Sequence, residues 1–276
     1  MRKLLVALLF VAVGLYIFSE RQQLRVSLKR ALDVAVEHEM AQAETLYERA
    51  NEMPKTFENG ELVTANIYWW TSGFFPGSLW LLYEHTGDEQ LRQYAEHYTS
   101  RLVSLKDYKG THDLGFMVFC PYGNAYRLTG DEYYKSVIEQ ASKSLITRFN
   151  PTVGCIRSWN TKHKTPELDF MVIIDNMMNL DLLFSASKLT GNPYYKEVAI
   201  KHANTTMPNH FRDNYTCWHV VSYNNDGTVQ MKETFQGKNH DSSWSRGQAW
   251  AVYGYTMVYR ETGEKRFLDF AEKVTD

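Results

Sequence analysis

One dipeptide recurs through the chain and constrains its fold more than any other feature. Thr-Gly stands at residues 86–87, 129–130, 190–191 and 262–263, each time between two segments with helical spacing of apolar residues. Glycine suits the position just after a helix, where the backbone φ is positive, and the polar residue after it favours the start of another helix. Each Thr-Gly therefore predicts a helix hairpin, and the hairpins repeat while the connecting loops grow longer.

The two helices of each hairpin differ in character. The segment before Thr-Gly is apolar nearly all round, as in residues 177–184 and 249–255, whereas the segment after it is amphipathic and charged, as in residues 88–106. A helix that is apolar on every side is buried on every side. The sequence therefore predicts an all-α fold with buried inner helices and an outer layer, and it favours a closed α/α barrel over an open solenoid.

Two segments interrupt the helical pattern. Residues 218–223 and 228–234 flank Asn224-Asn225-Asp226-Gly227, which predicts one β-hairpin insertion. Residues 149–170 form a second irregular stretch between helices. Long loops on a rigid scaffold are where function usually resides.

The N-terminus has the pattern of a targeting segment. Arg2 and Lys3 precede an apolar run over residues 4–18, which is shorter than the roughly 20 residues of a bilayer span. We therefore expect residues 1–20 to be a signal peptide or an N-terminal anchor, and residues 21–276 to be one barrel domain. A buried N-terminal helix is the alternative. The expected location is periplasmic or extracellular, with membrane contact only through this segment if it is retained.

Composition excludes several classes of function. Thirty basic and 32 acidic side chains give a net charge of −2, so we expect no nucleic-acid partner. Three scattered cysteines do not make a disulfide framework or a zinc knuckle, and no HExxH, P-loop or GxGxxG run is present. Metal-dependent hydrolysis and nucleotide chemistry therefore lack support in the sequence. Aromatic residues, at 14%, supply flat faces for stacking on sugars or bases.

Four residues that could bind or act on a ligand occupy equivalent positions, 15 or 16 residues before the Thr of each repeat: Trp70, Asp113, Asp175 and Arg246. These are the expected N-terminal ends of successive inner helices, so all four converge on one mouth if the layers close. Each Asp alone is as readily a helix N-cap as a catalytic group. Two such carboxyls facing one cavity favour catalysis, because paired carboxyls push their pKa values apart into an acid and a base.

A polar stretch over residues 234–250 leads into a buried helix. Arg246 is placed to bind a ligand carboxylate with its two-pronged guanidinium, and Trp244 and Trp250 offer stacking faces. The alternative is an Arg246 that pairs with Asp241 or Glu233, beside two core tryptophans. His219, on the predicted hairpin, contacts ligand if the hairpin folds over the mouth, although a lone histidine is more often structural.

Four runs of sequence strongly resemble glycoside hydrolase family 88, the unsaturated glucuronyl hydrolases. They are residues 70–80 (WTSGFFPGSLW), 112–116 (HDLGF), 173–180 (IIDNMMNL) and 246–250 (RGQAW), and the likeness extends from about residue 60 to the end. The resemblance implies an (α/α)6 barrel and an enzyme that needs neither a metal nor an organic cofactor. It also implies a small substrate, a lyase-generated glycosaminoglycan oligosaccharide with a Δ4,5-unsaturated uronic acid at its non-reducing end.

By this resemblance, an Asp protonates C4 of the vinyl ether and guides water to C5, after which the sugar opens and the glycosidic bond breaks. Asp175 matches that acid/base and Asp113 matches the second essential carboxylate. By similarity the sugar subsite is lined by His219, Gln236, Arg246 and Trp250, with His112 and Trp159 as weaker candidates. The residue pattern described above adds Trp244 and Trp70 as substrate-binding candidates.

Two departures from the family pattern matter. Lys238 and His240 stand where relatives usually carry Tyr and Asp, which suggests a preference for sulfated sugars. About nine helices are expected before Asp276, whereas six hairpins need twelve, so we expect a barrel that is incomplete at the C-terminus. The alternatives are an unsaturated rhamnogalacturonyl hydrolase acting on pectin fragments, and a non-catalytic helical-repeat binding module.

Overall fold

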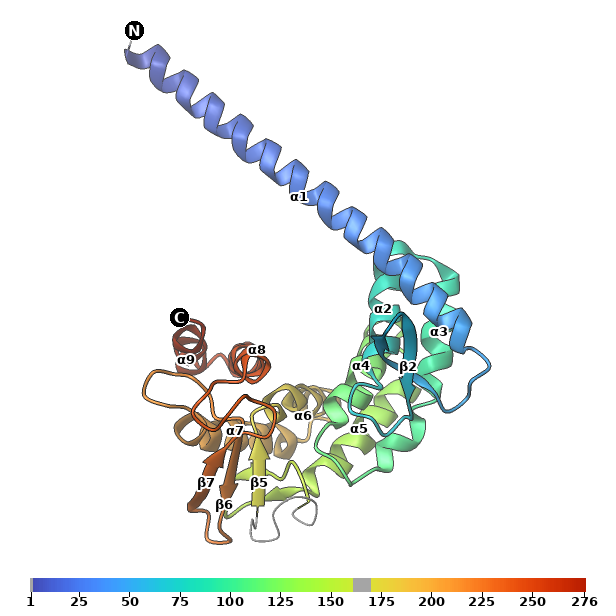
Figure 1. The fold of residues 1–276 in the computed structure, drawn as a ribbon, viewed down its shortest axis with the longest axis vertical. Coiled ribbons are helices and arrows are strands. Elements are labelled where there is room, and N and C mark those ends of the chain that lie inside the picture. Colours follow the sequence, from blue (N-terminus) through green and yellow to red (C-terminus); the bar gives the residue numbers. More distant parts are fainter. Residues whose placement is uncertain (1, 161–169) are drawn as a thin grey trace.

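In the computed structural model, residues 2–160 and 170–276 are described, with side chains from residue 20 onward. Four inner helices lie next to one another in chain order: α2 (Phe74–Thr86), α4 (Cys120–Thr129), α6 (Asn176–Thr190) and α8 (Ser245–Thr262). Each is followed by an outer helix: α3 (Glu89–Ser100), α5 (Glu132–Ile146), α7 (Pro193–Asn209) and α9 (Lys265–Thr275). The hairpins form an arc that runs from α2 and α3 to α8 and α9 (Figure 1).

The Thr-Gly hairpins form as predicted. The four glycines have φ values between 70° and 73°. Each Thr hydroxyl donates to the carbonyl four residues earlier and accepts the N–H two residues later, as Thr86 does with Leu82 and Asp88. Asp88, Asp131 and Asn192 then cap the outer helices, whereas Glu264 makes no side-chain cap. The dipeptide therefore ends one helix and positions the next with local hydrogen bonds alone.

The predicted β-hairpin is present and belongs to a larger sheet. Strands β6 (Val220–Tyr223) and β7 (Val229–Glu233) are antiparallel, and β5 (Phe170–Ile173) pairs with the other edge of β6. In this register Ile173 lies opposite Val220, which lies opposite Glu233. The sheet therefore joins the chain just before α6 to the hairpin that precedes α8.

The prediction of a single β-hairpin insertion is wrong in number, because two further two-stranded sheets occur in the described residues. Strands β1 (Met53–Glu58) and β2 (Glu61–Ala65) pair around Asn59-Gly60, where φ is 52° and 84°. Asn-Gly with positive φ at both residues is a strong hairpin signal, and the sequence reasoning overlooked it. Strands β3 (Phe149–Asn150) and β4 (Cys155–Ile156) close a short turn inside the irregular stretch.

Helix α1 (Arg2–Leu46) extends away from the body and packs on α2 and α3 at its C-terminal end (Figure 1). Arg101 fixes this end by donating to four backbone carbonyls, of Leu46, Tyr47, Arg49 and Glu52. Within residues 20–160 and 170–276, whose side chains are described, no helix is apolar over enough length to cross a bilayer. Apart from Glu20, the side chains of the predicted targeting segment lie outside the described residues, so that segment stays a prediction.

Two fully buried histidines make stability depend on pH. Burial lowers the pKa of His202 to about 3 and holds the pKa of His210 well below its usual value of 6.5. Both rings are therefore neutral in the folded protein, and His202 Nδ1 accepts the N–H of Ile156 at 3.1 Å. Between pH 6.5 and 3 the imidazole of His202 binds a proton in the unfolded chain but stays neutral in the folded chain.

We therefore expect the contribution of these two histidines to the free energy of unfolding to be complete above pH 6.5 and to fall as the pH falls towards 3. Each imidazole contributes a slope of up to about 1.4 kcal/mol per pH unit. Denaturant unfolding at a series of pH values measures this slope. In His202→Asn the amide oxygen can still accept the Ile156 N–H, but the group does not titrate, so the slope should become shallower. An equal slope in both proteins would contradict the role of His202.

Candidate active site

Asp175 lies where the three-stranded sheet meets an inner helix. Strand β5 ends at Ile173 and α6 begins at Asn176, so the chain turns at Asp175. The Ile174 N–H donates to the His219 carbonyl at 3.0 Å, which extends the pairing of β5 and β6 up to this turn. Asp175 occupies the N-cap position, yet its side chain makes no capping hydrogen bond. The capping alternative that the sequence left open therefore does not describe this carboxylate.

The carboxyl of Asp175 is nearly excluded from water. The residue is 8% exposed, and the Nε2 atom of His219 lies 3.7 Å from its Oδ2. Burial raises the pKa of Asp175 to about 7, and a negative charge on nearby Asp113 acts in the same direction. Arg246 and the indole N–H of Trp250 act in the opposite direction. At neutral pH this group exists in both its protonated and its ionised form.

The hydrogen bonds of His219 select one tautomer of its ring. Its Nδ1 atom lies 3.1 Å from the backbone nitrogen of Phe235, whose N–H donates to it. A ring nitrogen that accepts must carry a lone pair, so the proton of the neutral ring is on Nε2, the atom that faces Asp175. The ring packs at a centroid distance of 4.6 Å from Trp244 and 5.7 Å from Trp159. His219 is therefore a fixed donor directed at Asp175.

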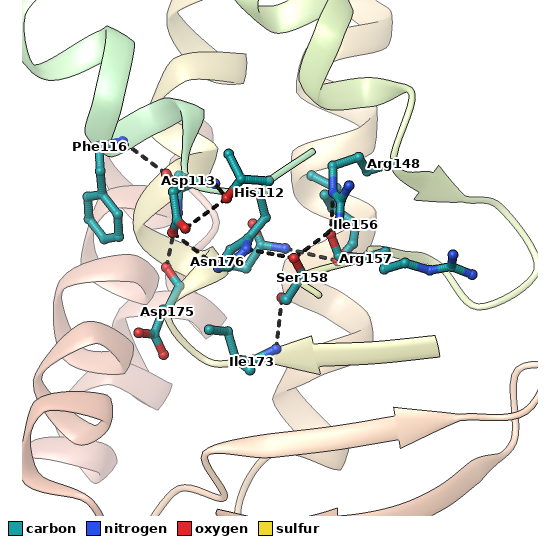
Figure 2. Close-up of polar contacts among 12 residues, drawn as sticks. His112, Asp113, Phe116, Arg148, Ile156, Arg157, Ser158, Ile173, Asp175 and Asn176 are labelled. Atoms are coloured by element: carbon teal, nitrogen blue, oxygen red, sulfur yellow. Dashed lines mark hydrogen bonds and ion pairs between the residues drawn. The ribbon is translucent and has the colours of Figure 1, made fainter. Parts of the chain in front are cut away.

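Asp113 lies just before η2 (Gly115–Phe119), a short π-helical turn that leads into α4. The Thr111 hydroxyl donates to Asp113 Oδ2 at 2.8 Å, and His112 Nε2 lies 3.2 Å from Asp113 Oδ1 (Figure 2). His112 is fully buried, and its Nδ1 donates to the Ser158 carbonyl at 2.9 Å. Burial lowers the pKa of His112, while the charge of Asp113 opposes this effect.

Asn179 and Ser158 hold the two carboxylates in register. The Asn179 side chain on α6 accepts the Phe116 N–H at 3.0 Å, which ties α6 to η2. The two elements approach so closely that a Cβ atom on Gly115 would lie 2.5 Å from Asn179 Cα, so only glycine fits there. Ser158 accepts the Ile173 N–H with its hydroxyl, while its carbonyl holds His112 (Figure 2).

Arg246 is an exposed cation at the rim, in the first turn of α8. Its guanidinium lies 4.4 Å from the Trp244 ring and 5.6 Å from the Trp70 ring, and it donates to Gln236 Oε1 at 3.0 Å. In the described residues this hydrogen bond replaces the pairing with Asp241 or Glu233 that the sequence left open. The tryptophans on either side are half-buried rather than core.

The structure brings all ten sequence-predicted site residues into one contiguous cluster, although their roles remain predictions. Trp70 and Trp250 are joined through Phe116, at centroid distances of 5.6 and 5.4 Å, and Trp159 stacks on Phe235 at 5.4 Å. Sequence reasoning missed four residues that support the cluster: Thr111, Phe116, Ser158 and Phe235. Thr111 and Phe116 flank or belong to the HDLGF run, which was a usable signal. Ser158 orients His112 with its backbone carbonyl and Phe235 orients His219 with its backbone N–H, and no side-chain pattern predicts these two contacts.

A cavity of about 390 Å³ lies beside Thr111 and Ser158, the residues that hold Asp113 and His112. Its lining is mixed aromatic and polar, from Tyr108, Gly110, Thr111, Ser158, Trp159, Asn160 and Met171. Among the residues with described side chains, no group of three or more His, Cys, Asp or Glu is arranged to hold a metal ion. What the site offers is one buried carboxyl that can exchange a proton, a second carboxylate, two oriented imidazoles and an exposed arginine between aromatic faces.

The comparisons with known proteins agree on one family. The model of Glycosyl Hydrolase Family 88 matches residues 40–273. An unsaturated glucuronyl hydrolase of Formosa agariphila is 48% identical over 75% of this chain and 52% of its own length. The chain thus spans about half the length of the curated relatives that it matches.

Solved structures show the same likeness. An unsaturated glucuronyl hydrolase specific for heparin superposes with a TM-score of 0.81 at 44% identity, over 86% of this chain and 63% of that one. A related structure in complex with dGlcA-Glc-Rha-Glc gives 0.80 at 29% identity, over 87% and 65%. These neighbours confirm the predicted fold class, the (α/α)6 barrel.

The charges around Asp175 predict how its pKa changes when a neighbouring cation is removed. Replacing Arg246 with Gln removes a cation that favours the ionised form, so the pKa of Asp175 should rise above its value of about 7 in the unmodified protein. Titration of the labelled Asp carboxyl carbons by NMR, with Asp175→Asn to assign the signal, measures this. The control is Lys238→Gln, which removes an equal charge from the adjacent loop and should leave the pKa unchanged. A lower pKa in Arg246→Gln would contradict the arrangement.

Proposed function

Because the chain belongs to glycoside hydrolase family 88, we propose that it carries the activity of an unsaturated glucuronyl hydrolase. Its substrates are short glycosaminoglycan oligosaccharides left by lyases, with a Δ4,5-unsaturated uronic acid at the non-reducing end. The observation that carries the proposal is the buried carboxyl of Asp175, whose pKa of about 7 suits a group that must both give and take a proton at neutral pH.

The reaction begins as a hydration of the vinyl ether. Protonated Asp175 gives its proton to C4, and positive charge develops at C5, where the ring oxygen stabilises it. A water molecule adds to C5 and returns a proton to the Asp175 carboxylate, so the enzyme is regenerated. The His219 Nε2–H lies 3.7 Å from this carboxylate, beyond hydrogen-bond distance, so it favours the ionised form only through the positive end of its N–H dipole.

The remaining steps need no further group from the protein. The hydroxyl added at C5 makes a hemiketal, which opens to a C5 ketone and leaves C1 as a hemiacetal that still bears the rest of the chain. This hemiacetal collapses to an aldehyde, the bond from C1 to the glycosidic oxygen breaks, and the shortened saccharide leaves with a proton on that oxygen. Water is therefore consumed, and the double bond disappears before the glycosidic bond is cut.

Arg246 and its neighbours are suited to the uronate. The guanidinium uses one nitrogen on Gln236 and lies at the exposed rim, so its other N–H groups can bind the carboxylate at C6 in a forked arrangement. Trp70 and Trp244 border this position and supply faces for the sugar ring. The cavity beside Thr111 and Trp159 is placed to receive the next sugar of the chain.

The test follows the ultraviolet absorbance of the C4=C5 double bond when the protein meets unsaturated chondroitin and heparin disaccharides. We expect the absorbance to decay, and Asp175→Asn to slow the decay by about 10²- to 10⁴-fold, the usual contribution of general acid–base catalysis. Asp181→Asn is the matched control: Asp181 is also a mostly buried carboxyl on α6, but it bonds Tyr253 and Arg260 away from the site, so the decay should persist.

Two outcomes would contradict the proposal. Equal decay in Asp175→Asn and the unmodified protein would remove Asp175 from the chemistry. No decay with any glycosaminoglycan disaccharide, together with decay of an unsaturated galacturonosyl-rhamnose, would replace the glucuronyl activity with the rhamnogalacturonyl one.

A further inference from the structure

The ring of His112 is oriented by a group that can only accept. The Ser158 carbonyl oxygen lies 2.9 Å from His112 Nδ1, so Nδ1 must carry the proton of that hydrogen bond. Ser158 is itself fixed, since the Arg148 guanidinium donates to the same carbonyl at 3.0 Å and the Ile173 N–H donates to its hydroxyl (Figure 2). In a neutral His112 ring the other nitrogen, Nε2, is therefore a bare lone pair.

That lone pair meets a second acceptor. Nε2 lies 3.2 Å from Asp113 Oδ1. The other carboxylate oxygen is already engaged: the Thr111 hydroxyl accepts the Asp113 N–H, so its single proton is directed to Asp113 Oδ2. Two lone pairs held 3.2 Å apart beside a fully buried ring repel each other, and a low local dielectric strengthens that repulsion.

We propose that His112 and Asp113 share one proton between Nε2 and Oδ1, so that the pair is electrically neutral as a unit. The proton turns a repulsive contact into a hydrogen bond within the usual range of N···O distances. His112 thereby becomes a positioning residue that acts through Asp113, because it fixes the rotation of the carboxylate and leaves Oδ2 as the oxygen held by Thr111.

The charged groups around the pair act in different directions. Arg148 disfavours a positive charge on His112, as burial does, and buried His202 also lies near this ring. Asp113 favours that charge. Asp175 lies close enough to Asp113 for a charge on one carboxyl to act on the other. A proton shared between the two groups satisfies these demands together, because neither a bare buried imidazolium nor an unpaired carboxylate beside Asp175 remains.

This inference deepens the proposed function, on which its catalytic meaning rests. The shared proton is committed to the pair, so Asp113 does not supply the proton for C4, and that role falls to Asp175 alone. A neutral pair also contributes little charge at Asp175. The presence of the proton itself does not depend on what the protein hydrolyses, so it can be tested without substrate.

The test is NMR of the complete chain with ¹⁵N-labelled histidine, in which His112→Asn identifies the signals of His112. A ring nitrogen that binds a proton resonates far from one with a bare lone pair. We expect Nδ1 to show a bound proton and Nε2 to lie at or near the protonated position across neutral pH, with a strongly downfield proton resonance. In Asp113→Asn, Nε2 should move to the bare position while Nδ1 stays, which shows that the Ser158 contact survives.

A second measurement uses the carboxyl pKa of Asp175. If Asp113 were an unpaired anion, it would raise the pKa of Asp175, and Asp113→Asn would lower that pKa. If the His112–Asp113 pair is neutral, the variant replaces it with a neutral Asn and a neutral His112, so the pKa of Asp175 should change little. A bare Nε2 in the unmodified protein, or a clear fall in the Asp175 pKa in Asp113→Asn, would overturn the proposal. Loss of activity with both signatures intact would instead count against the proposed function.

Discussion

Burial of the Asp175 carboxyl is the constraint on which the rest of the site depends. A carboxyl group withdrawn from water resists ionisation unless hydrogen-bond donors and cations surround it. The fold supplies only enough of these groups to leave the pKa of Asp175 near neutral pH. The sheet of β5, β6 and β7 covers the group and delivers His219, while α8 brings Trp250 and Arg246. Each element is needed where it is because a more exposed Asp175 would be an ordinary carboxylate, unable to hold a proton at neutral pH.

The helical framework could be predicted because its signals are local. Thr-Gly both ends a helix and starts the next through hydrogen bonds within a few residues, so the dipeptide alone located four hairpins. Strand β5 could not be predicted in this way, because it is a short buried run that becomes a strand only when it pairs with β6, some fifty residues later. The hairpin of β1 and β2 has a local signal, Asn59-Gly60, and could therefore have been predicted from the sequence.

The features of the site also divide into those with a signal in the sequence and those that depend on distant contacts. Asp113, Asp175 and Arg246 were located because equivalent positions in successive repeats meet at one mouth, and the family motifs supplied their neighbours. What the sequence could not supply is the state of each group. The raised pKa of Asp175 comes from burial. The Nδ1 atom is a donor in His112 and an acceptor in His219, because a carbonyl and an N–H of distant backbone segments lie beside the two rings. These states depend on how deeply the fold buries a carboxyl and on which backbone atoms it brings beside a ring, and neither can be recognised from the identity of the side chain.

All four Thr-Gly turns lie at the ends of the inner helices opposite the site, and each is closed by its own hydrogen bonds. One end of the molecule, the base, is therefore held by local hydrogen bonds of the Thr-Gly turns, whereas the opposite end, the rim around the site, is made of loops. Lengthening a rim loop costs little chain entropy and leaves the base hydrogen bonds untouched. Evolution can accordingly change the rim, and with it the saccharides admitted, by insertion and deletion alone, while the scaffold that presents the acid is inherited unchanged.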